Sequence, residues 1–159
     1  MNNKWVWIGI MAVILIGGAL GGVLLLTAVC ENTGSPPVPD CPSGLICPTS
    51  GEMCDTYADN EITGDALYKG QNLRVSGRVK EVQRSAIPGN TYLELACPGL
   101  FKFGLRGYFT TENEDMLIGI EKGEDVLVTG VGSGFQTLID SGFTYKVPTV
   151  NQITSVEEY

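Results

Sequence analysis

The sequence predicts a mainly β protein: a small five-stranded Greek-key barrel with short helices, preceded by one transmembrane helix. Three observations lead to this fold class. An uncharged apolar run fills residues 5–29, and alternating apolar and polar residues recur along the chain beyond residue 70. In addition, KGQNLRVSG at Lys69–Gly77 returns almost unchanged as KGEDVLVTG at Lys122–Gly130. Alternation with a period of two is typical of half-buried strands, so the recurrence indicates two strands that each bury one face in a similar environment.

The apolar run 5–29 is long enough to cross a bilayer. At about 1.5 Å per residue, a helix of this length spans roughly 37 Å, more than a ~30 Å hydrocarbon core. Lys4 precedes the run and the next basic residue is Lys69. The positive-inside rule therefore places residues 1–4 in the cytoplasm and the rest outside, in a single-pass protein of the cell membrane. Two alternatives stay open: a cleaved signal peptide, and a lipid attached to Cys30.

Glycines inside this run offer a surface for self-association. Gly17 and Gly21 form one pair with small-xxx-small spacing, and Gly18 and Gly22 form another. Such pairs let two helix backbones approach closely within a bilayer. The bilayer is therefore the expected partner of this run. The glycine pairs leave two interpretations open: association with a second copy, and the general abundance of glycine in membrane helices.

Residues 30–51 are predicted to be a stalk, because Pro, Gly and Ser dominate them and oppose regular structure. Three cysteines, Cys41, Cys47 and Cys54, are candidates for disulfides in an oxidising compartment, and either Cys41–Cys47 or Cys47–Cys54 would close a small loop. Gaps of five and six residues, with no histidine in the chain, oppose a zinc site. Cys97 lies in an alternating strand, which predicts a buried apolar thiol.

The globular domain is predicted over residues 52–156, with 157–159 as a tail. EMCDTYADNE is typical of a short helix with one apolar face, and Gly64 and Gly70 punctuate the stretch after it. In the first strand, NLRVSGRVK, an interior glycine, Gly77, falls on the core side. A glycine there permits the sharp bend that a small barrel needs.

Three more strands and one insertion complete the expected barrel. TYLELAC directs Leu93, Leu95 and Cys97 inward, and LFKFGLRGYF does the same with Phe101, Phe103 and Leu105. NEDMLIGIEKG, after the third strand, is expected to be a short helix or turn. The last strand, FTYKVPTVNQITSV, contains Pro148, which favours an edge or a bulge. Five strands with an insertion after the third follow the order of an OB-fold.

The domain resembles the tRNA_anti-like family, a group of OB-fold domains in small bacterial and archaeal proteins. The resemblance covers roughly residues 52–156, and a later Lys-Gly-x-x-Val-x-Val-x-Gly also fits the family pattern. It departs from that pattern in CPGLFKFGLRGYF, where a shorter turn is expected. The resemblance implies a fold and brings no catalytic residues. The motifs that carry it are Asn60-Glu61, Asp65, Tyr68-Lys69-Gly70 and Val75-Ser76-Gly77-Arg78-Val79.

The outward side chains of the first three strands form the candidate binding face. OB-folds bind oligonucleotides and oligosaccharides on such a face, and aromatic rings among cations suit single strands. A net charge of −8 opposes nucleic acid. We therefore expect a protein partner first, and an oligonucleotide or another anionic ligand, such as a glycan, as the alternative. The seven candidates are Arg74, Arg78, Lys80, Tyr92, Lys102, Arg106 and Tyr108.

Catalysis is not expected. The chain has no histidine and no G-x-S-x-G nucleophile motif, and it lacks the spacing of a calcium loop. No metal and no cofactor are predicted. The sequence thus indicates a membrane-anchored, extracytoplasmic, non-enzymatic OB-fold module that binds or scaffolds.

Overall fold

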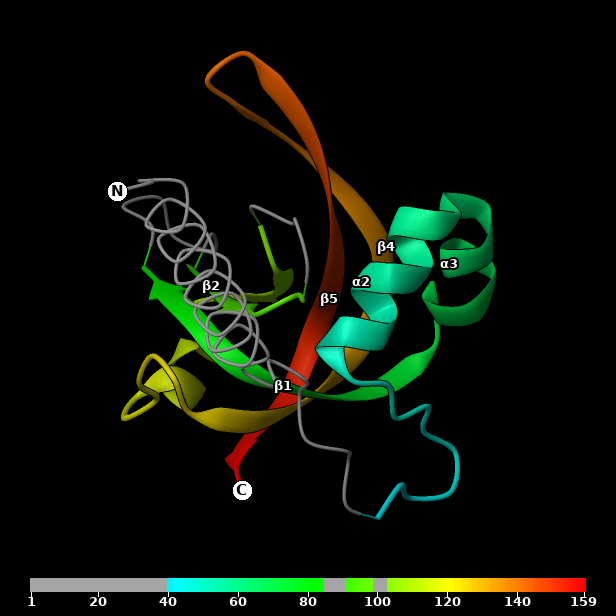
Figure 1. Cartoon of the computed structure of the whole chain (residues 1–159). Helices are drawn as coiled ribbons and strands as arrows, with labels where there is room; N and C mark the ends of the chain where they lie inside the picture. The colour runs from blue at the N-terminus through cyan, green and yellow to red at the C-terminus, as the bar shows by residue number, and fades with distance from the viewer. Residues whose placement is uncertain (1–39, 85–90, 99–102) are drawn as a thin grey trace, which may run out of the picture. The chain divides into compact units, whose positions relative to one another are not determined.

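Five strands close into a barrel in the computed structural model, which describes residues 40–84, 91–98 and 103–159 (Figure 1). Neighbours around the barrel follow the order β1-β2-β3-β5-β4, and β4 returns to β1. β3 and β5 are parallel, and the other neighbouring pairs are antiparallel. The predicted mainly β, five-stranded architecture is confirmed. The strands are β1 (Asn72–Gln83), β2 (Thr91–Leu95), β3 (Leu105–Phe109), β4 (Asp125–Asp140) and β5 (Phe143–Glu158).

The two copies of the recurring text are the antiparallel neighbours β1 and β4. Gly77 lies opposite Val126, and Gly130 lies opposite Leu73. A Cβ on Gly77 would lie 2.7 Å from Oγ of Ser50, and one on Gly130 would lie 2.7 Å from a backbone carbonyl oxygen of β5. Both glycines are therefore required by the close approach of another part of the chain, in addition to any bend of the sheet.

The apolar sides of the strands meet in one core inside the barrel. Burying an aliphatic or aromatic side chain of this kind contributes about 1.5–3 kcal/mol, so this cluster is the main source of stability. Its strand members are Leu73, Val75, Val79, Leu93, Leu95, Leu105, Phe109, Val126, Val128, Val150 and Ile153.

Two short helices precede the barrel, where the sequence predicted one. A capping box at Thr49 begins the first helix, and the Asn60 side chain caps the second. Gly64, expected to interrupt the chain, lies inside the second helix. A Cβ there would lie 2.5 Å from the Tyr57 ring, so glycine allows the two helices to pack closely. The helices are α2 (Ser50–Asp59), α3 (Glu61–Tyr68) and, after β3, the short 3₁₀ helix η1 (Glu114–Leu117).

Two disulfides tie the amino-terminal part of the domain. Cys41 pairs with Cys47, with 5.8 Å between their Cα atoms. Cys54 of α2 pairs with Cys97, with 5.9 Å between the Cα atoms. Of the two loop closures that the sequence left open, Cys41–Cys47 is formed and Cys47–Cys54 is not. The expectation of a free, buried Cys97 thiol is corrected, because Cys97 pairs with Cys54. The reason is tertiary: α2 packs beside the end of β2, where the Ser50 hydroxyl also donates to the Ala96 carbonyl at 2.8 Å.

The end of the predicted stalk lies along β1. Ile46 and Thr49 form isolated parallel bridges with Leu73 and Ser76. The earlier stalk residues and the predicted membrane helix 5–29, with its glycine pairs, lie outside the described residues. In the part of the chain that the structure describes, no helix has the length and apolar character needed to cross a membrane.

Candidate ligand-binding cleft

A long β4–β5 hairpin projects from the barrel (orange in Figure 1) and forms one wall of the candidate site. It turns at Ser141 and Gly142, whose φ angles are 50° and 82°. Positive φ at both central residues is what a tight type I′ hairpin turn requires. Pro148 lies opposite Phe135 in this projecting part, beyond the residues of β5 that pair with β3. The expected edge position of this proline agrees with that arrangement.

The opposite wall is the outer face of β1, β2 and β3. Between the two walls lies a cleft of about 460 Å³, which we call the charged cleft. Its volume falls within the ~300–1,000 Å³ range of small-molecule sites. Charged, amide, aromatic and apolar side chains line it: Lys80, Glu81, Gln83, Tyr92, Glu94, Phe103, Arg106, Leu138, Ile139 and Asp140.

Glu94 is the centre of the charged cleft. Its side chain is 3% exposed, and its carboxylate accepts hydrogen bonds from Arg106 Nε at 2.8 Å and from the Gly104 N–H at 3.0 Å. Lys80 Nζ lies 2.8 Å from the same carboxylate. Burial would raise the pKa of Glu94, but the three donors together lower it below its ordinary value. Glu94 is therefore ionised, and it holds both cations of the cleft.

Aromatic rings stack around the Arg106 guanidinium. Its central carbon lies 4.1 Å from the centroid of the Tyr92 ring and 5.4 Å from that of Phe103. Phe103 meets Tyr145 of the hairpin edge-on, with 4.9 Å between centroids. Burial, together with a hydrogen bond to a neighbouring carboxylate, raises the pKa of Tyr92 to about 12. The cleft therefore presents a neutral phenol and a guanidinium whose charge is paired with Glu94.

Four of the seven predicted site residues come together here. Lys80, Tyr92 and Arg106 line the charged cleft, and the ring of Tyr108 packs at a tilt beside that of Tyr92, with 6.0 Å between centroids. Lys102 lies outside the described residues. The cations among these four are paired with Glu94, so the expected open basic surface is absent from this part of the described structure.

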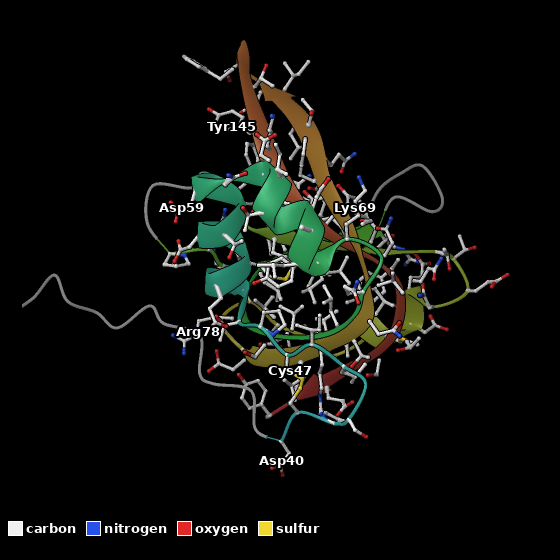
Figure 2. The ribbon with its side chains drawn as sticks, turned by 90° about the vertical axis from the view of Figure 1, so that its right-hand side faces the viewer. Asp40, Cys47, Asp59, Lys69, Arg78 and Tyr145 are labelled. Carbon is white, nitrogen blue, oxygen red and sulfur yellow. A yellow bond between two sulfur atoms is a disulfide. The ribbon has the colours of Figure 1, made fainter. Side chains whose placement is uncertain are left out.

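The two remaining candidates are directed elsewhere. Arg78 makes two hydrogen bonds of 3.0 Å to Asp125 of β4, and Arg74 bonds Glu157 of β5 at 3.2 Å. Figure 2 shows Arg78 well away from Tyr145 of the hairpin. The prediction of one continuous basic face is therefore corrected, because β1 curves around the barrel and each arginine finds its own carboxylate.

Sequence reasoning missed the hairpin wall and the role of Glu94. Glu94 lies opposite Arg106 in the β2–β3 register, and that register is not visible in the sequence. Phe103 was expected to point into the core. However, a Cβ on Gly104 would lie 1.8 Å from the Leu95 carbonyl oxygen, and β3 begins only after this close contact. Phe103 therefore lies outside the alternation of β3, and its ring lies beside Arg106.

Comparison with known families supports the fold. Residues 48–142 match the family described as tRNA_anti-like, which is more than half of the chain. The chain belongs to the tRNA_anti-like family. The match includes both helices, the charged cleft up to Asp140 and the strands from β1 to β4. A comparison of this tRNA_anti-like chain with curated proteins finds no match.

Several solved structures match this chain at low sequence identity. A "putative nucleic acid-binding lipoprotein" from Klebsiella pneumoniae is 16% identical, with a TM-score of 0.52 over 78% of this chain and 99% of that chain. The Stn1-Ten1 complex of S. pombe gives 19% and 0.40 over 55% of this chain and 57% of that chain. The small single-stranded DNA-binding protein of Streptomyces coelicolor gives 11% and 0.35, over 57% and 95%. At these identities the first match shows a shared fold, and the other two carry no further argument.

Among the described residues, no group of three or more Cys, Asp and Glu side chains is placed to hold a metal ion.

Proposed function

We propose that this chain is a non-enzymatic binding module that holds an extended segment of a protein partner in the charged cleft. The observation that supports this most is the pairing of both cleft cations with the buried Glu94, beside a hairpin whose tip exposes apolar side chains.

The charges of the cleft favour a protein over a polyanion. Two basic side chains face three acidic ones, Glu81, Glu94 and Asp140. The Arg106 side chain is only 10% exposed, and it already bonds Glu94. Nucleic-acid affinity comes mainly from cations that neutralise phosphates and release counterions. Cations that are already neutralised supply little of that affinity.

The hairpin tip supplies apolar contact area. Ile139 is 78% exposed and Phe143 is 67% exposed, and they lie near the turn. Leu138 and Ile139 also line the charged cleft. Large exposed apolar side chains that lie together mark interaction sites, and in a protein interface a few such anchors carry most of the binding energy.

Site-specific photo-crosslinking tests this proposal. A photoreactive amino acid replaces Phe143 in the full-length chain, expressed in its native cells. Ile118, which is 79% exposed on the connection between η1 and β4, provides a matched control position. We expect a discrete covalent adduct from position 143 that is absent from position 118 and is lost with Leu138→Asp. Identical adducts from both positions, or no adduct from position 143, would refute the proposal.

A single-stranded oligonucleotide is the second candidate. The neighbouring rings of Tyr92 and Tyr108 could stack with bases, and the Klebsiella structure is described as nucleic acid-binding. Fluorescence anisotropy with labelled oligothymidylate at low salt tests it. We expect no binding by the full-length chain. If the chain binds the oligonucleotide saturably and Tyr92→Ala abolishes this binding, the proposed ligand of the cleft becomes a nucleic acid instead of a protein.

The proposal includes a place in the cell: anchored by residues 5–29, with residues 1–4 in the cytoplasm and the barrel outside. The two disulfides support it, since such bonds persist mainly in oxidising compartments. Protease added to intact cells or spheroplasts should remove the barrel and leave a membrane-bound fragment. Protection of the barrel until the membrane is lysed would contradict this topology.

A further inference from the structure

A second hollow, about 580 Å³ in volume, lies between β3 and the base of the β4–β5 hairpin. We call it the neutral groove, because every side chain that lines it is a hydroxyl, an amide or an aromatic ring. Tyr108 of β3, Ser133 and Gln136 of β4, and Asn151 and Gln152 of β5 are among them. The groove is a neighbour of the charged cleft, since the ring of Tyr108 packs beside that of Tyr92.

Part of the polar lining is committed to the fold. The Asn113 side chain donates to the Ile153 carbonyl at 3.0 Å and accepts from the Thr110 N–H at 2.7 Å. The hydroxyls of Ser133 and Thr149 bond each other at 2.7 Å. These bonds fix the walls of the groove before any ligand arrives.

Other amides are available to a ligand. Asn151 and Gln152 are exposed, and their side chains make no hydrogen bond with another residue of the described ranges. Gln136 accepts from the Tyr108 hydroxyl through Oε1, which leaves its amide NH₂ group to donate. A primary amide combines one acceptor with two donors, so this group of side chains can serve a ligand that needs both.

The backbone at Gln152 is held in an unfavourable conformation. Its φ is 48°, in the left-handed region that glycine adopts readily and glutamine does not. The register between β4 and β5 shifts between Thr129 and Val131, opposite this part of β5. Strained positions cluster at ligand sites, and this one carries a side chain that lines the groove.

We propose that the neutral groove binds an uncharged saccharide. Vicinal sugar hydroxyls donate and accept at once, which matches the amides of Gln136, Asn151 and Gln152. The ring of Tyr108 offers an apolar face to sugar C–H groups. Without a cation in the lining, the groove has nothing to neutralise a phosphate, so a nucleotide fits it poorly. This inference concerns a different hollow from the charged cleft and does not rest on the protein partner proposed above.

An NMR titration of the full-length chain, held in a sugar-free detergent and labelled with ¹⁵N, tests it. The probes are maltotetraose, cellotetraose and chitotetraose at millimolar concentrations. We expect the side-chain amide signals of Asn151 and Gln152 to shift with at least one of them. The absence of a shift with all three, or shifts with the dinucleotide TpT instead, would overturn the proposal.

Three variants sharpen the result. Asn151→Ala and Gln152→Gly should each weaken binding of the responding saccharide about five- to tenfold, the loss of roughly one hydrogen bond. Gln152→Gly keeps the fold, because glycine adopts the observed φ without strain. Gln71→Ala, an exposed amide outside the groove, should leave binding unchanged. Undiminished binding by both groove variants would refute the site, whatever the crosslinks from Phe143 show.

Discussion

Glu94→Gln is the most informative single change, because one carboxylate organises the charged cleft. The substitution keeps the size of the side chain and removes its charge. Arg106, buried on the same face, then loses its counter-ion, with Nε only 2.8 Å from the former carboxylate. Removing one partner of a buried ion pair typically costs about 3–5 kcal/mol. Lys80 adds little, since 35% of its side chain is exposed and water can solvate it.

We therefore expect Glu94→Gln to lower the free energy of unfolding by about 3–4 kcal/mol, measured by urea denaturation followed by circular dichroism. The melting temperature should fall by roughly 10 °C or more. Arg78→Gln is the control: it removes an exposed ion pair on another part of β1 and should leave the urea midpoint nearly unchanged.

A double-mutant cycle decides whether the pair is the cause. Glu94→Gln combined with Arg106→Gln should cost less than the two single variants together, with a coupling of about 1–3 kcal/mol, since the second change removes the uncompensated charge. A loss below about 1 kcal/mol for Glu94→Gln, or strictly additive effects, would refute the reasoning that Glu94 holds the cleft together.

Three further predictions test the fold. The pKa of Glu94 is lowered in the folded state, so the ionised carboxylate stabilises the fold above its ordinary pKa of 4.5, and this contribution is lost as the pH falls below that value. In acid denaturation, the free energy of unfolding of Glu94→Gln should therefore depend less on pH below 4.5 than that of the unaltered chain. Gly77→Val should lower the free energy of unfolding in urea by about 1–3 kcal/mol, because a Cβ at this position would lie 2.7 Å from Ser50 Oγ. Gly107→Ala is the control and should leave stability nearly unchanged, because the nearest atom to its Cβ lies at 3.5 Å. Equal effects of the two substitutions would contradict this account. Cys97→Ser should lower stability by about 2–4 kcal/mol through loss of the bond to Cys54. A reducing agent should then lower the melting temperature less than it does in the unaltered chain, because only the Cys41–Cys47 bond remains to be reduced, and thermal melts with and without reductant can check this.

The alternation of side chains made the barrel predictable. Each strand buries one face, so its position can be predicted from the alternating apolar residues. In β1 these are Leu73, Val75 and Val79, and in β4 they are Val126 and Val128. The helix α3 and the length of the hairpin were not predictable in the same way. In the sequence, Gly64 suggests an interruption of the helix. The structure shows that a glycine is needed there because the ring of Tyr57 packs against it. The hairpin beyond the barrel has no buried face of its own to impose a pattern.

By itself, the sequence determined a five-stranded barrel and the tRNA_anti-like family, because both depend on local period and short motifs. It also identified Lys80, Tyr92, Arg106 and Tyr108 as residues of one outer face. Only the tertiary structure showed whether the cations on that face are free or already paired with carboxylates. A basic side chain attracts an anionic ligand only while it lacks a counter-ion, and the counter-ions of Arg74, Arg78 and Arg106 come from other strands. Which carboxylate meets which cation is set by strand register and by the curvature of β1, and these arise from packing across the whole barrel.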